Sequence, residues 1–122
     1  MNSDCTIYKT MNFVGKKWTL VIMLELYKAP VYAQRYSELK ASLADVTPKI
    51  LSLRLKELES EGLIDKTIDA SKFPIKCVYS LTPSGKDFVK ILKQIKDWSL
   101  EWKYNSKACE SSECRNCMVS KK

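Results

Sequence analysis

Residues 46–64 read VTPKILSLRLKELESEGLI. Thr47 is placed to cap a helix through its hydroxyl, and Pro48 occupies the first helical position, where a missing N–H costs nothing. Gly62 is the expected left-handed residue at the other end. Apolar residues at i, i+4 and i+7 give this helix one stripe to bury, formed by Leu51, Leu55 and Leu58. The segment therefore predicts a capped amphipathic helix that packs on a core through its leucines.

The charges of this helix run against its dipole. A helix dipole favours acidic residues in the first turn and basic residues in the last turn. Here the acidic residues crowd the end, while the first half carries the cations Lys49, Arg54 and Lys56. A basic helix start is favourable when phosphates and base acceptors, rather than water, face it. The charge order therefore indicates a helix that binds nucleic acid.

The neighbouring segments give this helix a recognisable context. Two strands are expected directly after it, over residues 63–70 and 76–82, joined by a loop with Lys72 and Lys76 at its ends. The remaining elements are a short extended stretch near Ala33 and helices over about residues 5–14, 18–28, 36–43 and 83–104. A short helix, a capped second helix and then a hairpin are the outline of a winged helix-turn-helix. We therefore predict a mainly α fold with a small β-hairpin (α+β).

Composition agrees with one nucleic-acid-binding domain. The chain has 122 residues, with 21 basic and 14 acidic side chains, for a net charge of +7. Such an excess suggests a polyanionic partner, nucleic acid first and an anionic membrane surface second. We expect a winged-helix DNA-binding and dimerisation domain over residues 1–104 and a cysteine-containing tail over residues 105–122. With no signal peptide and no apolar run long enough to span a bilayer, we expect a cytoplasmic protein without membrane contact.

The candidate DNA-binding face lies opposite the leucine stripe. The second helix of a helix-turn-helix enters the major groove, where lysines contact phosphate or guanine and serine contacts either kind of group. An apolar side chain there can touch a thymine methyl. The candidate residues are Thr47, Pro48, Lys49, Ser52, Leu53, Arg54 and Lys56 from the helix, with Lys72 and Lys76 from the wing. The competing interpretation is a solvated amphipathic helix followed by an ordinary loop.

Arg54 lies between the buried and exposed faces of the helix, and three roles are open to it. It can reach a phosphate, pair with Glu57 one turn on, or pair with an acidic residue on the preceding helix.

The chain resembles the HxlR-type family of winged-helix transcriptional regulators over about residues 5–104. The resemblance rests on Cys5, Gly15, Lys17, Trp18, Ser37, Glu38, Leu39, Pro48, Lys49, Leu51, Ser52, Arg54, Leu55, Leu58, Gly62, Leu63, Tyr79, Ser80, Leu81 and Thr82. It implies a homodimer built from the first and last helices that binds pseudo-palindromic operator DNA as a repressor or activator. Leu53 departs from the family, which often has a polar residue there, and Val78 replaces a usual polar strand residue.

Aromatic surface on the last helix supports the same assembly independently. Trp98 and Trp102 stand one turn apart near the end of one helix, and such surface is expected to be covered by a partner. The predicted dimer interface contains Ile7, Met11, Ile95, Trp98 and Trp102. Without any histidine, the commonest general base and metal ligand is missing, so we do not expect an enzyme. The alternatives are a non-sequence-specific nucleic-acid or chromatin protein and, less favoured, a thiol redox protein.

Five cysteines leave several roles open. Cys5 matches the cysteine that some members of the resembled family use to sense oxidants, and nearby Lys9 and the helix start favour a reactive thiolate. Its alternative is a small packed residue at a dimer interface. In the tail, a C-x4-C-x2-C spacing resembles part of a zinc or iron–sulfur ligand set, formed by Cys109, Cys114 and Cys117 with Cys5 as a candidate fourth ligand. Redox-switching thiols and incidental cysteines are the other interpretations.

Overall fold

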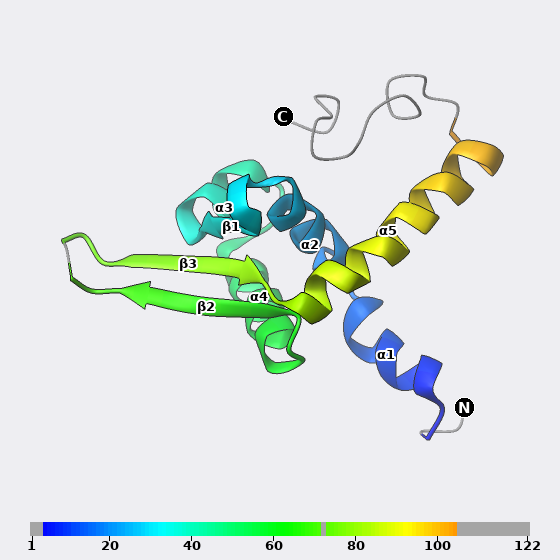
Figure 1. The fold of residues 1–122 in the computed structure, drawn as a ribbon, viewed down its shortest axis with the longest axis horizontal. Coiled ribbons are helices and arrows are strands. Elements are labelled where there is room, and N and C mark those ends of the chain that lie inside the picture. Colours follow the sequence, from blue (N-terminus) through cyan, green and yellow to red (C-terminus); the bar gives the residue numbers. More distant parts are fainter. Residues whose placement is uncertain (1–3, 72, 105–122) are drawn as a thin grey trace.

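The computed structural model describes residues 4–71 and 73–104. Its helices and strands, in chain order, are α1 (Thr6–Val14), α2 (Thr19–Lys28), the 3-10 turn η1 (Pro30–Tyr32), β1 (Ala33–Arg35), α3 (Tyr36–Ser42), α4 (Pro48–Ser60), β2 (Ile64–Asp69), β3 (Lys76–Leu81) and α5 (Pro83–Trp102). Helices surround the core, and the β2–β3 hairpin projects from one side of the body (Figure 1). The predicted winged helix-turn-helix is confirmed. No helix in residues 4–71 and 73–104 is long and apolar enough to cross a membrane.

The sheet has one strand more than the predicted hairpin. The three strands are antiparallel in the order β1-β3-β2. The short stretch near Ala33 becomes β1 by pairing with β3, with Ala33 opposite Ser80 and Arg35 opposite Val78. Local pattern indicated an extended segment there, but its partner lies more than forty positions along the chain. Pairing over such a separation is decided by the packing of the whole domain.

Both ends of α4 follow the predicted capping chemistry. The Ile50 N–H donates to the Thr47 hydroxyl oxygen at 3.2 Å, and Pro48 occupies the first helical position. At the far end Gly62 has a φ of +82°, and the N–H of Leu63 returns to the carbonyl of Leu58 at 3.0 Å. This is the Schellman arrangement, which satisfies carbonyls left without helical partners. The positions at which α4 begins and ends are therefore set by residues at its own two ends.

The core lies between α4, α2 and the inner face of the sheet. The three α4 leucines and the α2 residues Ile22, Met23 and Leu26 are each 0% exposed. The sheet contributes Ile64, Tyr79 and Leu81, and α5 contributes Val89. This packing fixes the rotation of α4 about its own axis, so the face opposite the leucines must point outward.

A tight junction joins the end of α4 to the start of α5. The Thr82 hydroxyl donates to the Gly62 carbonyl at 2.6 Å and accepts from the Gly85 N–H at 3.1 Å. Gly85 is buried, and a Cβ placed on it would lie 2.2 Å from the carbonyl oxygen of Leu63. Only glycine permits this approach, so Gly85 fixes α5 against the base of the hairpin.

Apolar spacing in two elements shows which residues share a face but not how far that face is buried. Strand alternation placed Ile68 on the same face as Ile64, yet Ile68 is 60% exposed, because the outer half of the hairpin extends beyond the core (Figure 1). In the last helix the apolar residues share one stripe from Phe88 to Trp98. Phe88 packs on the core, whereas Ile95 and Trp98, farther along, are about half exposed, as the predicted interface requires. The first half of α5 covers the domain, and its second half extends past it (Figure 1).

Candidate nucleic-acid interface

α4 presents an exposed, basic face. Lys49, Ser52 and Lys56 are all exposed, and Leu53 between them is 44% exposed. Thr47 and Pro48 are also exposed, at the start of the helix. We call Lys49, Ser52, Leu53 and Lys56 the α4 outer face. Each of its members was predicted from sequence, and the structure brings them together on one side of one helix.

Ser52 is held by a neighbour that the sequence did not identify. The hydroxyl groups of Ser52 and Tyr36 lie 3.2 Å apart, within hydrogen-bond distance. Tyr36 is the first residue of α3 and is half-buried. It therefore fixes the position of the Ser52 hydroxyl and links the two helices of the helix-turn-helix. Only the tertiary structure reveals this contact, because Tyr36 and Ser52 are sixteen positions apart.

Arg54 is engaged within the protein. Its Nη1 lies 3.0 Å from Glu57 Oε1, and its Nε donates to the carbonyl of Lys17 at 3.1 Å. Lys16 forms an ion pair with the other Glu57 oxygen. Of the three roles open to Arg54, the structure forms the pair with Glu57. We call Arg54, Glu57, Lys16 and the Lys17 carbonyl the α4 clamp, because they fasten α4 to the turn between α1 and α2.

The clamp predicts a specific pH dependence of stability. The hydrogen bond from Lys16 lowers the pKa of Glu57 below its usual 4.5, and Arg54 adds to this effect, while partial burial opposes it. A carboxyl whose pKa is lower in the folded state contributes stability that is present above its unfolded pKa. That contribution is lost as the pH falls through the folded pKa, below 4.5. Glu57→Gln should therefore cost about 1 kcal/mol of unfolding free energy at pH 7 and less at low pH.

Denaturant titrations at pH 7 and at pH 3 measure this difference. Glu59→Gln is the matched control, because Glu59 is an exposed glutamate on the same helix. An equal effect of the two substitutions at both pH values would contradict the clamp.

The hairpin leaves the body beside α4, in the position of a wing. α4 lies below the hairpin base in Figure 1. Lys76 is half-buried and pairs in register with Asp69, whose pKa is lowered mainly by hydrogen bonds from Ser71 and further by Lys76. Lys72 lies outside the described residues, so its role stays a prediction. Phe73 at the tip is 96% exposed.

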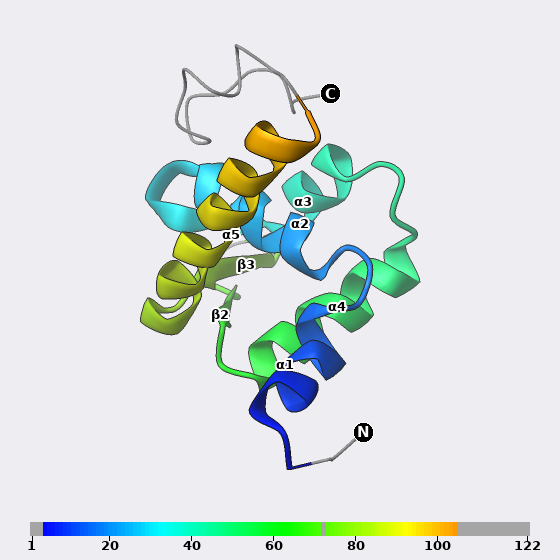
Figure 2. The same ribbon diagram turned by 90° about the vertical axis from the view of Figure 1, so that its right-hand side faces the viewer.

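Apolar side chains are exposed on the two terminal helices. The predicted interface residues Ile7 and Met11 of α1 are 66% and 51% exposed. On α5, Ile95, Trp98 and Trp102 are 47%, 55% and 70% exposed. α1 and the second half of α5 lie on the side of the molecule away from the hairpin (Figures 1 and 2). We call these five residues, with Ile91, the terminal-helix surface. Ile91 was missed in the sequence, although it stands one turn before Ile95.

The cysteines divide by position. Cys5 is exposed at the start of α1, and its carbonyl accepts the Lys9 N–H at 3.0 Å. Cys77 is half-buried on β3. Cys109, Cys114 and Cys117 lie outside the described residues, so the predicted zinc or iron–sulfur set is untested. Within residues 4–71 and 73–104, no group of three or more histidine, cysteine, aspartate or glutamate side chains is placed to hold a metal ion.

Comparisons with known proteins agree with this geometry. Residues 13–107 match the family described as HxlR-like helix-turn-helix. YvaP, an HTH-type transcriptional regulator of Bacillus subtilis, is 36% identical over 94 residues, which are 77% of this chain and 83% of YvaP. A solved structure described as a MarR-family transcriptional regulator, from Porphyromonas gingivalis, is 31% identical with a TM-score of 0.73, covering 84% of this chain and 96% of that one.

A second solved structure is that of the redox regulator HypR in its oxidised form. It is 26% identical with a TM-score of 0.70, and the alignment covers 82% of this chain and 99% of that one. The family match spans most of the described residues, including α4, the hairpin and α5. The chain therefore belongs to the HxlR-like helix-turn-helix family and is a transcriptional regulator with a DNA-binding helix-turn-helix domain.

Proposed function

We propose that this regulator binds specific, pseudo-palindromic DNA sites as a homodimer, reading bases with the α4 outer face and contacting the backbone with the hairpin. The observation that carries the proposal is the exposed basic face of α4, held outward by buried leucines and the α4 clamp. A rigidly held helix is needed because base readout depends on fixed donor and acceptor positions.

Each member of the α4 outer face has a distinct role in this proposal. Lys49 and Lys56 carry the charges that bind phosphate or guanine acceptors. Ser52, oriented by Tyr36, donates to or accepts from a base edge. Leu53 gives an apolar contact suited to a thymine methyl group. Arg54 acts indirectly, because its donors are engaged by Glu57 and the Lys17 carbonyl, so it positions α4.

The terminal-helix surface supports the dimer. Two neighbouring indoles that are more than half exposed are costly in water, and burying them against a second copy removes that cost. A two-fold axis through α1 and α5 leaves both hairpins and both α4 helices free. Each copy would then meet one half-site, with half-sites about 34 Å apart.

Selection of bound sequences from a random DNA pool tests the proposal. We expect an enriched motif with two inverted half-sites. Titration of that motif and of a scrambled duplex against salt should give an affinity ratio of at least about 1,000. A ratio near one would favour the non-sequence-specific alternative, and no binding to any duplex at low salt would reject DNA binding by this domain.

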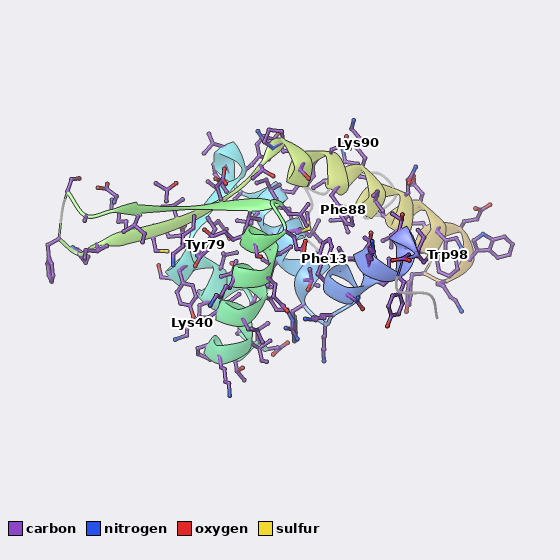
Figure 3. The ribbon with its side chains drawn as sticks, turned by 90° about the horizontal axis from the view of Figure 1, so that it is seen from below. Phe13, Lys40, Tyr79, Phe88, Lys90 and Trp98 are labelled. Atoms are coloured by element: carbon purple, nitrogen blue, oxygen red, sulfur yellow. The ribbon has the colours of Figure 1, made fainter. Side chains whose placement is uncertain are left out.

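Two substitutions on α4 should separate charge from base readout. Lys49→Ala should weaken binding to every duplex and lower the slope of affinity against salt by about one unit, because one phosphate contact is lost. Ser52→Ala should instead change the preference among half-site sequences. Lys90→Ala on α5 is the control, because its side chain is 78% exposed and far from α4 (Figure 3). If Ser52→Ala kept the wild-type motif, Ser52 would not read bases.

We extend the proposal to an oxidant response through Cys5. The exposed thiol lies at the start of α1, the helix that carries Ile7 and Met11 of the terminal-helix surface. The redox regulator HypR has a similar fold, and this similarity supports an oxidant response in the present protein. Diamide should change the operator affinity of the wild-type protein but not of Cys5→Ser. An equal response from both proteins would assign oxidant sensing to another residue.

A further inference from the structure

A groove of about 570 Å³ runs between α1 and α4. One wall is formed by Lys9 and Phe13 of α1 and by Lys16 from the turn after it, and the α4 wall includes Leu53, Lys56 and Glu57. This volume lies in the range of small-molecule sites, about 300–1,000 Å³. Sequence reasoning did not identify it, because its two walls come from helices more than thirty positions apart.

Among the residues that the structure describes, some charged side chains in the groove have an ion-pair partner and others have none. Glu57 is already paired with Lys16 and Arg54, so its negative charge is compensated within the α4 clamp. Lys9 and Lys56 form no ion pair or hydrogen bond through their side chains within residues 4–71 and 73–104. Glu61 also lines the groove, is exposed, and forms no ion pair within the described residues. Lys9 and Lys56 line the groove from its two helices, and after Glu61 is counted against them one positive charge remains in excess.

The apolar part of the groove lies between these cations. Phe13 packs partly on the core and remains half-buried, and Leu53 is 44% exposed. A DNA phosphate needs cations and donors but gains nothing from an aromatic and an aliphatic wall. A small molecule with an apolar body and an anionic group uses both features. We propose that the groove binds a small organic anion with an aromatic or aliphatic body, held by Lys9 and Lys56 against Phe13 and Leu53.

Occupancy of the groove would change DNA binding, and this step rests on the proposed function. Leu53 and Lys56 belong both to the groove and to the α4 outer face. A bound anion neutralises Lys56 and covers Leu53, so both become unavailable to DNA. The ligand and DNA therefore compete for the same side chains, and the ligand lowers the affinity for DNA.

Calorimetric titration of the full chain with naphthoate, and separately with neutral naphthamide, tests the site without DNA. Naphthoate should bind at least about ten-fold more tightly than naphthamide, because the carboxylate gains two charge contacts. Lys9→Ala should weaken naphthoate binding about ten-fold, and Lys90→Ala should leave it unchanged. Equal affinities for the two probes, or unchanged naphthoate binding by Lys9→Ala, would overturn the proposal.

Titration of the selected DNA motif with and without naphthoate tests the competition. Saturating naphthoate should lower the DNA affinity of the wild-type protein about ten-fold and that of Lys9→Ala much less. Without naphthoate, Lys9→Ala should bind DNA like the wild type. Weaker DNA binding by Lys9→Ala alone would make Lys9 a DNA contact and overturn the assignment. Failure of the wild type to bind DNA rejects the proposed function, while the calorimetric test of the groove still stands.

Discussion

Replacing both Trp98 and Trp102 with alanine is expected to convert the protein to monomers and to weaken binding to a two-half-site DNA about 100-fold or more. The two indoles are 55% and 70% exposed, on a helix that extends past the body (Figure 1). Buried tryptophans often dominate interface energies, and each would be removed twice in a symmetric dimer. A monomer also loses the gain from binding two half-sites at once.

Light scattering and DNA titration measure the two parts of this expectation. The double variant should have the 14.0 kDa mass of one chain, whereas the wild type should have twice that mass. Phe73→Ala is the matched control, since Phe73 is an even more exposed aromatic residue at the hairpin tip. It should remain a dimer. A double variant that stays dimeric would place the interface elsewhere, and a monomeric wild type would reject the dimer altogether.

Leu55→Ala is expected to lower the free energy of unfolding by about 3 kcal/mol. Leu55 is 0% exposed at the centre of the leucine stripe, and α2 and the sheet pack on the same core. Its truncation leaves a cavity that the surrounding backbone can close only in part. A domain of this size has a total stability of about 5–15 kcal/mol, so the loss is large enough to shift a urea unfolding curve well beyond error.

Leu53→Ala is the matched control for this experiment, because it makes the same change two residues away on the same helix. Leu53 is 44% exposed, so its truncation should cost less than about 1 kcal/mol. The order of the two variants should be the opposite for DNA affinity. The folded Leu53→Ala protein should bind its preferred site more weakly than the wild type, and the folded Leu55→Ala protein should bind it as the wild type does. Similar unfolding free energies for the two variants would mean that α4 is rotated from its position here.

Residues 46–64 show which structural features could be predicted from neighbouring residues alone. The hydroxyl of Thr47, the fixed backbone of Pro48 and the left-handed φ of Gly62 act within four positions of themselves, so the ends of α4 could be predicted. The leucine spacing likewise indicated which face is buried. Because the buried face determines the outer face, the candidate DNA-binding residues followed from the same pattern.

The last helix shows where such a pattern fails. Its apolar residues continue at helical spacing as far as Trp102, but periodicity does not show where the domain beneath the helix ends. Phe88 meets the core, while Ile95 and Trp98 extend past it. Ile68 in the wing is exposed for the same reason. An apolar pattern indicates a shared face, and the size of the core decides how much of that face is covered.

The sequence by itself determined the order of the elements, the caps and buried stripe of α4, and the exposed set Lys49, Ser52, Leu53 and Lys56, because each depends on neighbours within a few residues. Only the tertiary structure decided that β1 joins β3, that Tyr36 holds Ser52, and that α1 and α4 enclose a groove. It also decided among the partners of Arg54, one of which is the carbonyl of a residue 37 positions away. Contacts over such separations depend on how the whole core packs, and the periodicity of one segment contains no information about them.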